Sequence, residues 1–223
     1  MATLEVVVSD LQDAQAAQKG GAQAVELALD LPADGLTPSL ELVQQVRAAL
    51  DITLRVILRP HDRGFVYSVA DITRMTQQAA DFAAAGVDGL VVGGQREDGR
   101  LDHELLAQIA TAAPGVPLTL HRVIDRVPNA TAALETALPH IQRLLTSGCT
   151  PNAWTGRSQI QAWVRRFGDR LHIAAGGGIT QHNAVDLARE TGTPEIHMGG
   201  GVRRSDRVDA ELVHQLVASL RAI

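Results

Sequence analysis

Eight short apolar runs alternate with longer segments of helical character, and this alternation constrains the fold more than any other feature. The runs occupy residues 4–9, 24–29, 53–59, 89–94, 117–122, 143–148, 171–177 and 195–200. Most of them are nearly continuous in apolar residues, which is typical of parallel strands covered by helices. The sequence therefore predicts eight parallel strands, each followed by a helix.

The segments between the runs carry apolar residues at helical spacing. In residues 39–50 the apolar positions fall on one helical face, and Ser39 precedes them as an N-cap. Residues 71–86 repeat the pattern and stop at Gly86, a residue typical of helix C-termini. Pro139 is expected to shorten the helix before the sixth strand. Further helices are predicted at residues 10–20, 102–115, 180–192 and 209–223.

Eight strand–helix units in 223 residues predict an α/β protein with one domain over residues 1–223, a single (β/α)₈ TIM barrel. The alternative is an open, doubly wound sheet. No G-x-G-x-x-G pattern follows the first strand, which favours the barrel.

Charge and composition exclude several classes of protein. A formal net charge of −5 gives no basic footprint for nucleic acid, and no segment has the length and apolarity of a membrane span. The single cysteine, Cys149, cannot form an internal disulfide, which fits a reducing compartment. The N-terminal residues resemble a strand and not a signal peptide. We therefore expect a cytoplasmic protein without nucleic-acid or membrane partners.

Charged side chains gather where the predicted strands end, and strand ends carry the chemistry of TIM barrels. Five residues are candidate catalytic groups: Glu26, Arg59, His121, Arg122 and Asp125. Glu26 lies between apolar neighbours and needs a partner inside the barrel, because burying a lone charge is costly. Arg59 and Arg122 are the expected partners. The set forms either a ligand site or a structural ion-pair network.

The two imidazoles near strand ends leave their roles open. His121 fits a general acid or base, a metal ligand or a buried structural histidine, and His197 lies at the matching height of the eighth strand. No H-x-H or C-x-x-C pattern occurs, so the sequence assigns no metal ligands.

Glycines follow the last two strands, where TIM barrels commonly bind phosphate. We expect Gly176, Gly177, Gly178, Gly199 and Gly200 to hold an anion through backbone N–H groups. The alternative is that these glycines only permit tight turns.

Several motifs together resemble the CutC family, known as copper homeostasis proteins. They are VEL at 25–27, GLTPS at 35–39, ILRP and GFVYS within 57–68, DGRLD at 98–102, LHRVID at 120–125, LLTSG at 144–148 and GGGI at 176–179. The resemblance implies a cytoplasmic TIM barrel, a homo-oligomer (dimer or tetramer), a polar cluster at the barrel mouth, and a role in copper handling with copper as the bound ion.

The sequence departs from the family pattern where copper chemistry would need sulfur. The usual VELC is VELA here, with Ala28 in place of a cysteine, and FHRAFD has become LHRVID. Copper(I) favours thiolate and thioether ligands, so the cysteine content does not support it.

The sequence therefore supports two alternative functions. One is a CutC-like copper homeostasis protein that binds copper, with a polar ligand site at the C-terminal mouth of the barrel. The other is an enzyme, an isomerase or lyase acting on a small phosphorylated or anionic metabolite. Schiff-base chemistry is disfavoured because Lys19, the only lysine, lies near the end of the first helix. A structural or regulatory oligomer without a ligand is a third possibility.

Overall fold

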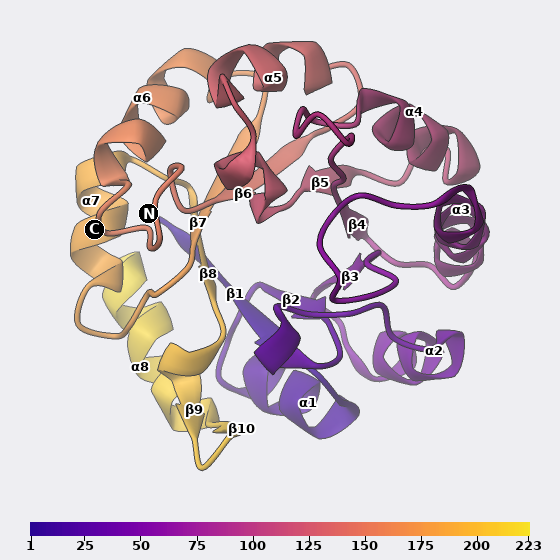
Figure 1. Ribbon diagram of the computed structural model, residues 1–223. Coiled ribbons are helices and arrows are strands. Elements are labelled where there is room, and N and C mark those ends of the chain that lie inside the picture. Colours follow the sequence, from indigo (N-terminus) through magenta and orange to yellow (C-terminus); the bar gives the residue numbers. More distant parts are fainter.

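The computed structural model describes residues 1–223 and shows a closed barrel of eight parallel strands in chain order. Figure 1 looks along the barrel, with the strands at the centre and the helices in a ring around them. The strands are β1 (Thr3–Val8), β2 (Ala24–Leu27), β3 (Thr53–Ile57), β4 (Gly89–Val92), β5 (Leu118–Leu120), β6 (Arg143–Thr146), β7 (His172–Gly176) and β8 (Glu195–Met198). Pairing of β1 with both β2 and β8 closes the sheet, so the predicted TIM barrel is confirmed.

Eight helices and three short 3₁₀ turns connect the strands. They are α1 (Leu11–Lys19), α2 (Leu40–Ala49), α3 (Val69–Ala84), α4 (His103–Ala112), α5 (Ala130–Ala137), α6 (Arg157–Phe167), α7 (Ala184–Thr191), α8 (Ala210–Arg221), η1 (Leu31–Ala33), η2 (Arg122–Arg126) and η3 (Gly200–Val202). Ser39 caps α2 through its hydroxyl, as predicted. Gly86 follows the end of α3 with φ of +80°, and α5 ends before Pro139. Helix α6 and the hairpin β9 (Arg203–Arg204) with β10 (Arg207–Val208) were not predicted individually.

Side-chain alternation along the strands separates an apolar layer from a polar lumen. In β1, Leu4, Val6 and Val8 belong to the main hydrophobic core, which packs between the barrel and its helices. Glu5 and Val7 alternate with them and therefore face the lumen. The strands look nearly continuously apolar because most of their outward residues are apolar, and single charged residues on the inward face lie between them.

The strands' C-terminal ends and the loops after them form the mouth of the barrel, and the glycine-rich turns after β7 and β8 lie there. None of the helices combines the length and apolarity needed to cross a bilayer.

Candidate functional site

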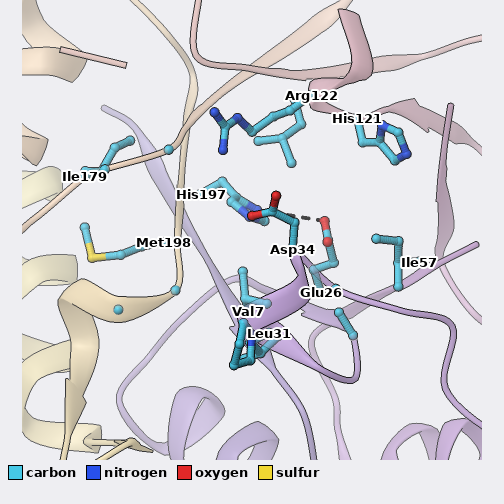
Figure 2. Close-up of a pocket in the computed structure, with 18 of the residues that line it drawn as sticks. Val7, Glu26, Leu31, Asp34, Ile57, His121, Arg122, Ile179, His197 and Met198 are labelled. Atoms are coloured by element: carbon cyan, nitrogen blue, oxygen red, sulfur yellow. Dashed lines mark ion pairs between the residues drawn. The ribbon is translucent and has the colours of Figure 1, made fainter. Parts of the chain in front are cut away.

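A cavity of about 1340 Å³ opens at the barrel mouth. Most of the predicted site residues, although they come from separate strand ends, line this one cavity: Glu26, Arg59, His121, Arg122, Asp125, Gly177, Gly178, Gly199 and Gly200. Gly176 is the exception, because it lies within β7, where an added Cβ would meet Leu145 and His197. Figure 2 shows Glu26, His121, Arg122 and His197 around the cavity.

Glu26 enters the cavity from β2, but its partner is not the one expected. The residue is 4% exposed, and its Oε2 has no hydrogen-bond partner. The nearest cationic group is His197, whose Nδ1 lies 3.9 Å from that oxygen (Figure 2). The predicted pairing with Arg59 or Arg122 is therefore wrong. Glu26 aligns in register with Arg55, which places Arg59 about 13 Å farther along the chain direction.

His197 connects Glu26 to a second buried carboxylate, Glu5. Its Nδ1 lies 2.6 Å from Oε2 of Glu5 on the neighbouring strand β1. Burial alone would lower the pKa of His197, but the carboxylates of Glu26 and Glu5 outweigh it and raise this pKa. Burial raises the pKa of Glu26, and the negative charge of Glu5 adds to the rise against the opposing effect of His197. The pKa values of both groups are therefore raised, which favours a protonated His197 beside Glu26.

A network of ion pairs below this pair fills the lumen. Glu5 binds Arg55 at 2.6 Å and Arg143 at 2.5 Å. Glu195 binds Arg143 as well, and it contacts His172 Nε2 at 2.8 Å. Although burial opposes it, Arg143 above all holds the pKa of Glu5 well below its usual range. In this network the carboxylates of Glu5 and Glu195 are thus balanced by two guanidinium groups. Glu26 forms its ion pair with His197 instead.

Arg59 is buried and clamps the loop after β2. Its Nη1 donates to the carbonyl oxygens of Ala33 and Gly35, at 3.0 Å for Gly35. Its backbone N–H donates to Thr37 Oγ1 at 2.7 Å, and its guanidinium lies 5.0 Å from the centre of the Phe65 ring. The charge of Arg59 thus serves loop carbonyls and not the carboxylate of Glu26.

His121 lies in the cavity wall as a neutral imidazole. Its Nδ1 accepts a hydrogen bond from Val123 N–H at 3.1 Å, which leaves the proton on Nε2. Burial and the positive charge of Arg59 lower the pKa of His121 to about 3. Nε2 is buried without a partner. The geometry suits a hydrogen-bond donor better than a general base, and the ring packs 5.2 Å from Phe65.

Arg122 stands over the glycine turn after β7. A Cβ added to Gly177, which has φ of +100°, would lie 3.0 Å from Arg122 Cζ, so the guanidinium and the turn are in close contact. Arg122 Nη2 donates to Ser147 Oγ at 3.3 Å, and its Nε lacks a hydrogen bond. A guanidinium beside a turn without side chains, at the edge of a cavity, has the chemistry of an anion site.

Asp125 lies in the same wall but is occupied by the loop after β6. Its two oxygens accept hydrogen bonds from Thr146 Oγ1, from the backbone N–H and hydroxyl of Ser147, and from Cys149 N–H, at 2.5–3.0 Å. Arg122 Nε lies 3.5 Å away. Asp125 therefore fixes the loop and orients Arg122 while keeping few lone pairs for a ligand.

Comparison with known proteins assigns the family. The CutC family model matches residues 2–202. The chain belongs to the CutC family. It is 35% identical over 195 residues to the human "copper homeostasis protein cutC homolog", covering 87% of this chain and 71% of that protein. A CutC family protein of Photobacterium profundum is 34% identical over 198 residues, covering 88% and 81%. The crystal structure of the putative copper homeostasis protein CutC from Streptococcus agalactiae has a TM-score of 0.85 at 25% identity, covering 93% of this chain and all of that one.

The CutC relatives' names raise the question of copper, and the donor atoms do not fit copper(I). Cys149 is the only thiol, and burial together with Asp125 raises its pKa to about 11, so it stays protonated. The one group of acidic, histidine or cysteine side chains close enough to share an ion is Glu5, Glu26 and His197, with ligand atoms within 4.8 Å of one another. That group has no sulfur, and both oxygens of Glu5 are already engaged by arginines and His197.

Sequence reasoning missed the charged residues inside the strands of this CutC-family barrel. Glu5 and Arg55 each lie between two aliphatic residues, and Arg143 and Glu195 each precede an apolar run, which was the available signal. The predicted site residues lie at the strand ends instead. A single charge in a buried strand indicates a lumen-facing position, because only the inward face of a barrel offers it partners.

Proposed function

We propose that the barrel mouth binds a small anionic molecule, phosphorylated or carboxylated, and moves a proton on it. The observation that carries the proposal is Glu26, a buried carboxyl with an unpartnered oxygen beside His197 in a large cavity. A structural carboxylate would be paired, as Glu5 and Glu195 are. With no hydrogen bond to its Oε2 and a raised pKa, Glu26 has the character of a functional acid or base.

Arg122 and the glycine turns would hold the charged end of the ligand. Backbone N–H groups and a guanidinium form strong, charge-assisted hydrogen bonds with an oxyanion, which offset the cost of removing it from water. His121 Nε2–H, which has no partner in the chain, would donate a further hydrogen bond to the ligand. Glu26 or His197 would remove a proton at one position of the ligand and return one at another, the chemistry of an isomerase, or take part in a lyase reaction. Lys19 is exposed on α1, so no lysine of this chain supplies a Schiff base at the mouth.

A titration with inorganic phosphate tests the anion site. Isothermal calorimetry should detect binding to the wild type and a loss of about tenfold or more in Arg122→Ala, because a charge-assisted contact is removed. Arg165→Ala removes the same charge from the exposed side of α6 and should bind as the wild type does. Equal phosphate affinity in all three proteins would contradict the proposal.

An NMR titration of His197 tests whether Glu26 and His197 are coupled in protonation. In Glu26→Gln the pKa of His197 should fall, because one of the two carboxylates that raise it is gone. In Glu97→Gln, which changes an exposed loop residue, the titration should be unchanged. An unaltered His197 titration in Glu26→Gln would show that the two groups do not share a proton.

Copper binding, which the relatives' names suggest, is the second candidate, and the donor set gives it little support. We expect a copper(I) titration under reducing conditions to find no binding tighter than micromolar. Tight binding that is lost in Cys149→Ser would restore the copper function and overturn this expectation.

A further inference from the structure

The loop between β2 and α2 is built to hold one carboxylate at the mouth. It turns through η1, and the residues on either side, Asp30 and Asp34, both have left-handed backbones, with φ of 48° and 65°. The backbone bridge between Leu29 and Leu36 closes its base. Non-glycine residues adopt this conformation at a cost, which the surrounding contacts must offset.

Arg59 supplies those contacts at the positions that flank Asp34. Its guanidinium binds the carbonyl oxygens of Ala33 and Gly35, the residues immediately before and after Asp34. Arg59 is 5% exposed and is itself held by Thr37 and the Phe65 ring. These two hydrogen bonds from a buried guanidinium restrain the backbone on both sides of Asp34.

Asp34 is an exposed residue that lines the cavity and has no side-chain partner there. Figure 2 shows its side chain in the cavity, with Glu26, His197 and Arg122 around it in this view. The Asp34 carboxylate forms no hydrogen bond or ion pair within the chain, although Arg122 and Arg203 line the same cavity. The buried Oε2 of Glu26 also lacks a partner. The cavity is thus lined by two carboxylates with free hydrogen-bonding capacity, Glu26 and Asp34, and by Arg122 beside the turn at Gly177.

We propose that Asp34 is a second recognition residue and that the ligand is a small anion bearing hydroxyl or ammonium groups at the end away from its charge. The proposal rests on the anion site of the proposed function and adds the chemistry of the opposite end. Ligand donors would satisfy Asp34 and Glu26, while the anionic group lies at Arg122 and Gly177. Arg59 is a positioning residue in this arrangement, because it acts through the loop and not on the ligand.

The test compares three phosphate esters of increasing donor content, in the presence of a chelator so that no bridging cation contributes. Propyl phosphate has no donors beyond the phosphate, 2-aminoethyl phosphate has an ammonium group, and ribose 5-phosphate has hydroxyl groups. The wild type should bind at least one of the latter two about tenfold more tightly than propyl phosphate, and the preferred ester distinguishes ammonium from hydroxyl recognition.

Asp34→Asn is the decisive variant, because asparagine tolerates the left-handed backbone and keeps the loop intact. The preference should disappear, while propyl phosphate binds equally well or more tightly, since a negative charge near it is removed. Asp51→Asn, which removes an exposed carboxylate away from the cavity, should keep the preference. Arg59→Met should lose the same preference, and the double variant with Asp34→Asn should lose no more, as expected when one residue acts through the other.

The outcomes separate this inference from the proposed function. If propyl phosphate binds through Arg122 but the wild type shows no preference, or if Asp34→Asn retains the preference, the role of Asp34 is overturned and the anion site stands. If no ester and no inorganic phosphate binds, both proposals fall.

Discussion

His121 illustrates how one residue can be buried, polar and uncharged at the edge of a site. It follows β5, its Nδ1 caps the turn η2, and its surroundings include the guanidinium groups of Arg59, Arg122 and Arg126. Burial above all, and then the positive charges of these arginines, favour the neutral imidazole. The same environment that removes His121 as a base makes the folded protein sensitive to acid.

We predict that His121 contributes a loss of stability between about pH 6.5 and pH 3. In this window the unfolded chain binds a proton on His121 and the folded chain, with its pKa of about 3, does not. The free energy of unfolding should therefore fall by about 1.4 kcal/mol per pH unit as the pH decreases from 6.5, in addition to other groups.

Urea unfolding at a series of pH values checks this. In His121→Asn, where the amide oxygen can still accept the Val123 N–H, the slope should be shallower by about one proton. His214→Asn, an exposed change on α8, should keep the wild-type slope. Identical slopes in His121→Asn and wild type would contradict the prediction.

The glycine turn after β7 lets side chains from other elements pack directly against its backbone. Gly177 and Gly178 have φ of +100° and +66°, and the absence of Cβ atoms lets Arg122 and Asn152 pack against them. The tight turn is observed at these glycines, and the proposed anion site would use the backbone of the same turn. The close approach of Arg122 is what connects them.

Gly177→Ala separates the two roles. It should destabilise the protein by about 1–2 kcal/mol through backbone strain and also weaken phosphate binding, because its Cβ displaces the Arg122 guanidinium. Gly115→Ala is the matched control, since Gly115 has φ of +83° with open space around its Cβ position. It should show the strain in urea unfolding but not the loss in calorimetry. Unchanged phosphate affinity in Gly177→Ala would remove the turn from the anion site.

Across the whole molecule, the lumen network ties together strands from both ends of the chain. Glu5 on β1, Arg55 on β3, Arg143 on β6 and Glu195 on β8 meet inside the barrel. These contacts span up to 140 residues of sequence. His197, which lies beside Glu26 at the mouth, contacts this network directly through its hydrogen bond with Glu5.

Glu5→Gln should therefore destabilise the entire barrel, by about 3–5 kcal/mol, because it leaves buried guanidinium charge incompletely neutralised. Denaturant unfolding at neutral pH measures the loss, and Glu97→Gln, in an exposed loop, should change stability by less than about 0.5 kcal/mol. A loss below about 1 kcal/mol in Glu5→Gln would show that the network is dispensable for folding.

The homo-oligomer, dimer or tetramer, stays a prediction that sedimentation equilibrium can test.

The sequence by itself determined the eight strand–helix units, their order and the single barrel they form. These follow from apolar periodicity and caps such as Ser39, which are written in contiguous residues. It also brought Glu26, His121 and Arg122 to one end of the molecule, since strand ends gather at the mouth of a barrel.

Only the tertiary structure decided which charges meet. Arg59 binds the backbone carbonyls beside Asp34, and Glu26 lies next to His197. Glu5, which stands within an apolar run of the sequence, is the centre of the ion-pair network in the lumen. The physical reason is that such pairs depend on strand register around a closed barrel, and on the pairing of β1 with β8 across nearly the whole chain. No local pattern of residues encodes that register.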